Sequence, residues 1–269
     1  MTRPADLPDF SKPPLNEVVL GVQFSPPAGY TQIQAGEVWS LYRERYPRVE
    51  EYMPLPPAYE LFGLPGMGQT SNQFSFLEGP LHDRYWFLRP AGDELIQFQN
   101  DRLLHNWRKV GDSSNPYPRF ENMLPQFEDE LNALERYVTR LVPQKLTINQ
   151  YEISYINHIP VSQTGDFRVA EWLNFLKEVP ADAEGFQFSF REVIKENEDS
   201  LLGRLICEVV GGYKPTGERL ISLSLTVRGA PGDSTIKSAL DSIVKARRII
   251  VDKFSEITTS VAHKLWERK

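Results

Sequence analysis

Two stretches decide the fold that this sequence predicts: Asn16-Glu17-Val18-Val19-Leu20-Gly21-Val22-Gln23-Phe24 and Tyr151-Glu152-Ile153-Ser154-Tyr155-Ile156-Asn157-His158-Ile159. Apolar side chains occupy every second position of the first stretch, and this period of two is typical of a half-buried strand. Each stretch is followed by a short helical pattern that holds a tryptophan, then by a block of alternating strands, and then by an amphipathic helix. The chain therefore repeats one order of elements.

In the first half, a proline-glycine break at 26–29 precedes a helical pattern over 36–46. Residues 47–70 are rich in proline and glycine, and we interpret them as an irregular connection, which in compact domains is often functional. The pattern then predicts strands over 73–77, 84–89, 94–100 and 102–109, and a helix over 117–141 that contains Pro125.

In the second half, the pattern predicts a strand over 146–159, a short helix over 169–178, and strands over 186–191, 201–210 and 219–228. Asp233 or Ser234 is expected to cap a last helix that runs to residue 266 and is roughly 50 Å long. An apolar stripe follows this helix at intervals of three and four residues, and Arg247 interrupts it.

These patterns predict an α+β fold of two similar β-α-β(3-4)-α halves, in which helices cover one face of an antiparallel sheet. We divide the chain into an irregular arm (1–13), a first half (14–143) and a second half (144–269) with the long C-terminal helix. The order of elements resembles the saddle of the TATA-box-binding protein and, more loosely, the helix-grip fold. A shared topology implies a shape and not a function.

Several motifs, in order along nearly the whole chain, resemble a sporadically distributed bacterial and archaeal family of uncharacterised proteins. They are Pro13-Pro14-Leu15-Asn16-Glu17-Val18-Val19, Gly92-Asp93-Glu94-Leu95-Ile96-Gln97-Phe98-Gln99 with Asp101-Arg102 and Asn106-Trp107, Tyr155-Ile156-Asn157-His158-Ile159, and Ala262-His263-Lys264-Leu265-Trp266. Members of that family usually carry arginine at the position of His158. The resemblance implies an accessory role in a multi-gene prokaryotic system, such as defence, and brings no established activity, cofactor or catalytic residue.

Composition limits the class of protein. A hydrophobic content of 41% and an aromatic content of 12% suffice for a folded core. A net charge of −6 disfavours nucleic-acid binding, which depends on neutralising phosphates. The one cysteine, Cys207, lies in an apolar run and is interpreted as a small buried strand residue. With neither a signal-peptide pattern nor an apolar run of membrane-spanning length, we expect a cytoplasmic protein without a membrane partner.

The sequence shows no motif with an established catalytic or metal-binding mechanism. The four histidines, His82, His105, His158 and His263, lie outside the metal-ligand spacings. There is no GxSxG elbow. The glycines at 63–68 are interrupted by Pro65, which lacks an N–H and so makes a phosphate-binding loop less favourable. The acidic turn 196–199 lacks the glycine and distal glutamate of a calcium loop. We therefore predict no catalytic residue, no metal and no cofactor.

A group of aromatic and polar strand residues forms the candidate binding surface. Its members are Trp86, Arg89, Arg102, His105, Trp107, Tyr155, Asn157, His158 and Arg191. Tryptophan, tyrosine and arginine give large contacts at low entropic cost, which suits recognition. The alternative is the ordinary polar face of an antiparallel sheet. The basic cluster at 245–248 is interpreted as a solvated helix face.

The leading hypothesis is a non-enzymatic binding protein with a protein partner or a second copy of itself, or with a small ligand held between sheet and helices. One alternative is a nucleic-acid-binding module, which requires a basic sheet surface. The other is an enzyme that places His105, His158 and a carboxylate in one pocket.

Overall fold

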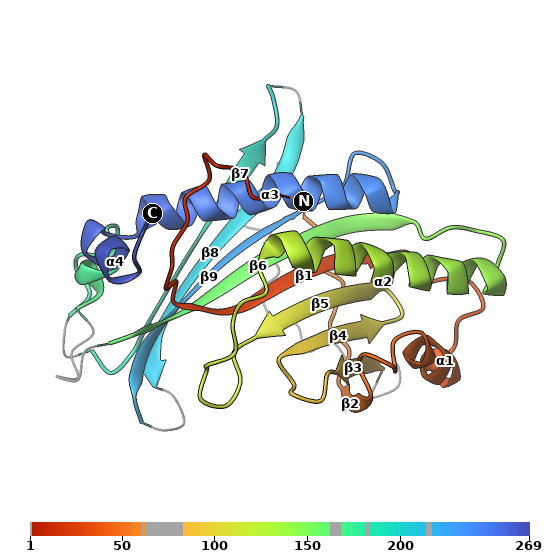
Figure 1. Ribbon diagram of the computed structural model, residues 1–269. Helices are drawn as coiled ribbons and strands as arrows, with labels where there is room; N and C mark the ends of the chain where they lie inside the picture. The colour runs from red at the N-terminus through yellow and green to blue at the C-terminus, as the bar shows by residue number, and fades with distance from the viewer. Residues whose placement is uncertain are drawn as a thin grey trace.

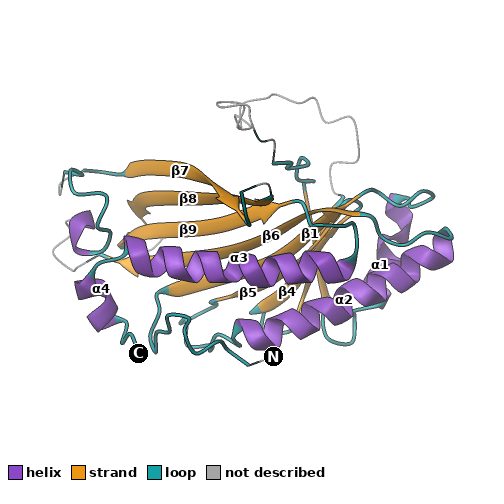
Figure 2. Cartoon of the chain, turned by 90° about the horizontal axis from the view of Figure 1, so that it is seen from above, coloured by secondary structure: helices purple, strands orange, loops and turns teal. Residues whose placement is uncertain are grey.

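The fold is an antiparallel sheet of nine strands in the order β2-β3-β4-β5-β1-β6-β9-β8-β7 (Figure 1). It is seen in a computed structural model that describes residues 2–60, 62, 83–161, 168–180, 183–198, 200–213 and 217–269. Two long helices, α2 (Phe120–Leu141) and α3 (Ile236–Ile257), lie side by side over one face of the sheet (Figure 2). The predicted α+β class and antiparallel sheet are confirmed.

The centre of the sheet is the pair β1 (Leu15–Phe24) and β6 (Ile148–Pro160). These strands contain the two stretches with which the sequence pattern began. They pair antiparallel, with Leu20 opposite Ile153 and Val22 opposite Tyr151. All four of these side chains are at most 1% exposed. The period-two pattern therefore places the core on one face of both strands.

On one side of this pair, β5 (Arg102–Arg108) joins β1, followed outward by β4 (Glu94–Gln99), β3 (Arg84–Leu88) and β2 (Arg48–Tyr52). Strand β2 lies inside the stretch that was predicted to be irregular, so that prediction was wrong there. Pro47 directly precedes this strand, and the other described prolines of the stretch, at 54, 56 and 57, follow it. The predicted strand over 73–77 lies outside the described residues.

On the other side, β9 (Arg219–Gly229) pairs with β6, and β8 (Leu201–Tyr213) and β7 (Phe186–Lys195) follow outward. All three strands were predicted, and each is longer than predicted. Strand β7 is the sheet edge, and most of its residues are partly or fully exposed.

Two short helical segments are shorter than predicted. The turn η1 (Gln32–Gln34) leads into α1 (Ala35–Ser40), after which the chain continues in turns to residue 45. Of the helix predicted over 169–178, one turn, η2 (Val169–Glu171), is helical.

The last helix is broken where the sequence predicted continuity. Thr235, and not Asp233 or Ser234, caps α3, and its side chain accepts a hydrogen bond from the Ser238 amide at 3.2 Å. Thr258 is extended, and Thr259 caps a separate helix, α4 (Ser260–Leu265). Threonine side chains compete with helical hydrogen bonds, which accounts for a break at this pair. Trp266 consequently stacks on Phe254, with ring centroids 5.3 Å apart.

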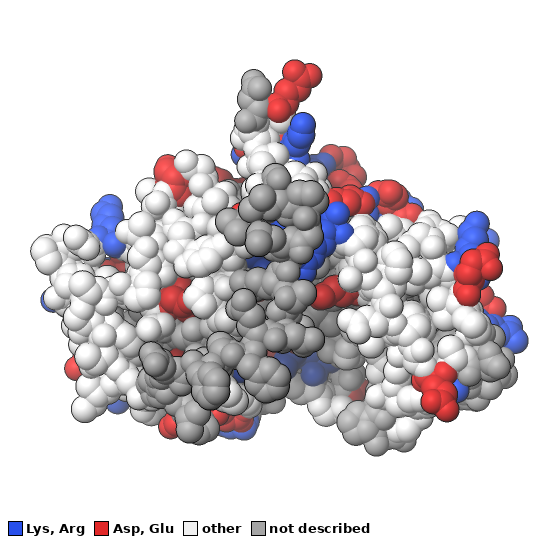
Figure 3. Space-filling view, turned by 180° about the vertical axis from the view of Figure 1, so that it is seen from behind, with Lys and Arg blue, Asp and Glu red and all other residues white. Residues whose placement is uncertain are grey.

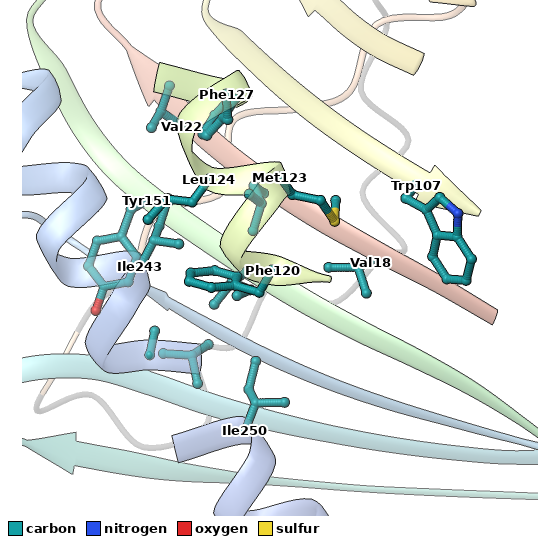
Figure 4. Packing of buried hydrophobic residues seen from close by; sticks show 14 of the residues in the cluster. Val18, Val22, Trp107, Phe120, Met123, Leu124, Phe127, Tyr151, Ile243 and Ile250 are labelled. Carbon is teal, nitrogen blue, oxygen red and sulfur yellow. The ribbon is translucent and has the colours of Figure 1, made fainter. Parts of the chain in front are cut away.

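The core fills the space between the sheet and the two long helices (Figure 4). Phe120 and Phe127 of α2 and Ile243 and Ile250 of α3 are completely buried. Cys207 is also completely buried, as the sequence predicted. In the described part of the chain, the search for a helix long and apolar enough to cross a membrane found none.

The N-terminal arm lies against the C-terminus. Amides of Ser11 and Lys12 donate to the carbonyls of Glu267 and Trp266 at 3.1 and 3.0 Å. The Asp9 carboxylate contacts both Arg119 (3.0 Å) and Lys269 (2.8 Å). The described residues of the arm, 2–13, thus form no helix or strand but are held by these contacts.

Candidate functional site

The nine candidate residues are divided between the two faces of the sheet. We call the face opposite the long helices the helix-free face. Strand alternation and the contacts of neighbouring residues place Trp86, Arg102, His158 and Arg191 on the helix-free face and His105, Trp107, Tyr155 and Asn157 on the helix-covered face. Arg89, at the end of β3, forms a 2.7 Å ion pair with Glu94. The candidates therefore form two sets and not one surface.

His105 belongs to a buried polar network beneath α2. Its Nδ1 lies 2.9 Å from Oε2 of Glu130, and the Tyr46 hydroxyl donates to the other oxygen at 2.7 Å. Gln126 also donates to Glu130, at 3.1 Å. Burial, followed by the charge of Glu130, raises the pKa of Tyr46 well above its usual value, so the phenol stays neutral and donates. This network ties β5 to α2.

Tyr155 and Asn157 line a cavity of about 60 Å³ between the N-terminal arm and α3. The Tyr155 hydroxyl lies 3.2 Å from that of Tyr117. Arg247 lines the same cavity, forms a 2.8 Å ion pair with Glu121, and is 4% exposed. The prediction that residues 245–248 form a solvated face was therefore wrong for Arg247. Its position within the apolar stripe was the signal of burial.

His105 and His158 lie on opposite faces of the sheet, so the structure does not bring them into one pocket. Trp107 is a core residue, with its ring 5.0 Å from that of Tyr117. Within the described ranges, the search for three or more metal-ligating side chains in one group found none.

On the helix-free face, Arg102 lies in a row of buried polar side chains. Strand pairing aligns Gln99 of β4, Arg102 of β5, Gln23 of β1 and Gln150 of β6. All four are between 5% and 6% exposed, although the two long helices lie over the other face (Figure 2). Buried polar groups require hydrogen-bond partners, and for three of these four the partners lie in one segment of irregular chain.

That segment is Met53–Glu60, which we call the crossing segment. Gln99 forms two hydrogen bonds with the main chain of Leu55: its amide nitrogen donates to the carbonyl at 2.9 Å, and its oxygen accepts from the N–H at 2.8 Å. Gln23 holds Ala58 in the same way, at 2.8 and 3.0 Å. Each glutamine therefore satisfies both the N–H and the carbonyl of one residue.

Arg102 completes this cluster. One guanidinium nitrogen donates to the carbonyl oxygens of Pro56 at 2.9 Å and Leu55 at 3.3 Å. The Asp101 carboxylate holds the guanidinium through bonds of 3.0 and 3.2 Å. We call Gln23, Gln99 and Arg102 the main-chain clamp, because the crossing segment supplies only backbone atoms to it.

The end of the crossing segment is held by charge. Glu60 contacts Arg204 of β8 at 2.5 Å and Arg228 of β9 at 3.5 Å, and its side chain is 6% exposed. Arg228 also forms a 2.6 Å ion pair with Glu152. The segment therefore runs across the strands, from β4 over the central pair to β8.

Aromatic residues border the clamp at the outer strands. The rings of Trp86 and Tyr52 lie 4.3 Å apart, and Arg84 and Arg108 lie over the Trp86 ring at 5.9 and 5.4 Å. Where residues are described on this side of the molecule, acidic and basic groups are interspersed among uncharged ones (Figure 3). Arg191 is exposed on the edge strand β7 and lies away from the clamp.

Sequence reasoning selected Arg102 but not the glutamines or Glu60. The sequence did contain a signal that the helix-free face of β4 is buried. Gln97 and Gln99 alternate with apolar residues there, whereas the solvated face of a strand more often carries charged side chains. The partner segment gave no sequence signal that links it to this face. We found no protein-family model that matches the chain, and no curated protein is significantly similar to it.

Proposed function

We propose that this chain is a non-enzymatic interaction protein that binds an extended segment of a protein partner on the helix-free face of its sheet. The observation that carries the proposal is the main-chain clamp. Its three side chains are buried and directed at peptide groups of an irregular segment, in place of water. An ordinary solvated sheet face would leave such side chains exposed.

The charge pattern favours a protein over a nucleic acid. Three described arginines of this face are paired with carboxylates, Arg102 with Asp101, Arg228 with Glu152 and Arg204 with Glu60, and two more, Arg84 and Arg108, lie over the Trp86 ring. Phosphate binding needs cations that remain available, since affinity comes from counterion release. Peptide groups, in contrast, are matched by glutamine, which donates and accepts at once.

The two-half organisation and the saddle shape are part of this proposal. Support comes from strand order: β1 and β6 are adjacent at the centre, and the last strand of each half returns to pair with its first. A duplicated unit gives one continuous face across both halves, and the crossing segment contacts strands of both. From the family resemblance we place the protein as an accessory component of a multi-gene prokaryotic system.

Site-specific photocrosslinking tests the proposal. A benzophenone amino acid at Arg191, exposed on the helix-free face, is expected to crosslink a stoichiometric partner in the source cells. The matched control is Glu128, exposed on α2 on the opposite side, which is expected to give none. Crosslinks from Glu128 alone, or a free monomer in sedimentation together with no crosslink, would refute the function. Sedimentation also separates a second copy of this chain from a different partner.

A further inference from the structure

The crossing segment is bound to the sheet in the manner of a ligand. None of its residues belongs to a helix or strand after β2 ends at Tyr52. Among the described residues, the hydrophobic core includes no side chain from Met53 to Glu60. Met53 and Tyr59 are about half exposed, at 53% and 49%. The attachments are thus mainly polar, and they can be exchanged for those of another chain without opening the core.

From these contacts we infer that residues 53–60 are an intramolecular ligand of the helix-free face. The partner displaces them with an extended, proline-containing segment that carries an acidic side chain at the position of Glu60. The inference rests on the proposed function and specifies both the partner's chemistry and the regulation of the site.

The clamp uses the N–H groups of Leu55 and Ala58, which are three residues apart. Three residues are one turn of a polyproline II helix, so groups at this spacing face the same side. Proline has no N–H, and the prolines of the segment are at 54, 56 and 57, which donate no hydrogen bond to the clamp. The partner is therefore expected to tolerate proline at these positions and to lack it at the positions of Leu55 and Ala58.

The carboxylate supplies direction. Glu60 lies two residues after the second clamped position and meets Arg204 at the far end of the path. A peptide bound in the reverse direction would place its acid near the Trp86 cluster and leave Arg204 without this contact. The ligand class is therefore an acidic, proline-containing extended peptide in one orientation.

Tethering makes the segment a strong competitor. A segment linked to its own site acts at an effective concentration in the millimolar range, so a free peptide with the same contacts binds the wild-type chain weakly. Weakening the tethered copy lowers this competition and raises the apparent affinity for a free peptide, because more of the protein is in the competent state.

Fluorescence anisotropy with a labelled peptide of residues 53–60 tests the inference. The variant Ala58→Pro removes the N–H that donates a hydrogen bond to the Gln23 side chain. This variant is expected to bind the free peptide about tenfold more tightly than wild type. The control Ala58→Ser keeps the N–H and should behave as wild type. Free peptides with proline at the Ala58 position or glutamine at the Glu60 position should bind A58P about tenfold more weakly than the native peptide.

A second variant keeps the test decisive if A58P is poorly folded. Glu60→Gln in the chain removes the ion pairs but no main-chain contact, and it should raise the affinity for the native peptide about tenfold. Equal peptide binding by wild type, A58P and E60Q, or no binding by folded variants, would overturn the inference. A partner crosslinked at Arg191 in that case would leave the proposed function standing. Peptide binding without a cellular partner would refute the function and the displacement by a partner, and it would leave only the assignment of residues 53–60 as an intramolecular ligand.

Discussion

The two faces of the sheet are both buried near the centre, but for opposite reasons. Neighbouring residues of β5 show this: Leu103 is completely buried toward the helices, and Arg102 is 6% exposed on the helix-free face. Leu103 is held by apolar packing, which is strong and non-directional. Arg102 is held by its ion pair with Asp101 and by hydrogen bonds to the crossing segment, and another chain with the same main-chain groups can replace those hydrogen bonds. The comparison separates the face that maintains the fold from the face suited to exchange partners.

The largest expected effect comes from the helix-covered face. Phe127→Ala removes a completely buried ring between α2 and the sheet, and we expect it to lower the free energy of unfolding by about 3–5 kcal/mol. Urea denaturation followed by circular dichroism measures this loss. The control Glu128→Ala, at the next and exposed position, should change stability by less than about 0.5 kcal/mol. Equal effects of the two variants would contradict the placement of the core.

The sequence alone predicts most of the helix-covered face, but not every element on it. Alternation in β1, β6 and β9 identifies the face that packs against helices, because the apolar side chains recur every second residue. Helix α2 was predicted to within three residues at its start. The break at Thr258 was missed, because the apolar stripe continues past it and the break is marked only locally, where Thr258 ends α3 and Thr259 caps the start of α4.

The helix-free face was harder to predict. Gln23 and Gln99 are polar residues at strand positions that water usually solvates, so their burial depends on where a distant segment lies. That position is a tertiary property, set by contacts between residues 35 or 44 apart in sequence. Arg247 was misjudged for the same reason, since its partner Glu121 is on another helix.

A smaller but clear effect is expected on the helix-free face. Arg102→Met leaves the Asp101 carboxylate with Gln99 as its remaining side-chain donor and removes the bonds to Leu55 and Pro56. We expect a loss of about 3 kcal/mol, because one charge of a buried pair is left uncompensated. The control Arg84→Met, in the same row, should cost at most about 1 kcal/mol from its contacts with aromatic rings. Guanidinium denaturation compares the two, and a smaller loss for R102M than for R84M would contradict the clamp.

A stabilising change with a defined pH dependence is expected at Glu17, on the helix-free face. Burial raises the pKa of this carboxyl above its usual 4.5, opposed by a hydrogen bond from Asn106 and by the charge of Arg108. The folded state therefore binds the proton more tightly than the unfolded state, and this residue's contribution to stability falls as pH rises above 4.5 through the raised pKa. Glu17→Gln should raise the melting temperature at pH 7.

The same variant sharpens the test when the pH is lowered. Near pH 4 the native carboxyl is protonated in both states, so the advantage of E17Q over wild type should shrink toward zero. Thermal melts at both pH values measure it, with exposed Glu128→Gln as control. An advantage that grows at low pH would show that Glu17 is stabilised as the anion, and the sign of the argument would be reversed.

Thiol reactivity probes the two faces directly, and the variant that it uses is expected to change stability the least. Cys207 lies on the helix-covered side of β8, and burial, followed by the charges of Glu192 and Glu208, raises its pKa to about 12. Only the thiolate reacts with a disulfide reagent, so native protein at pH 8 should show negligible labelling until it unfolds. The variant Arg191→Cys places a second thiol on the exposed edge of the helix-free face, and it should consume one equivalent within minutes. Rapid labelling of wild-type protein would mean that the helix-covered face opens in the native state, and the distinction between a fixed and an exchangeable face would fail.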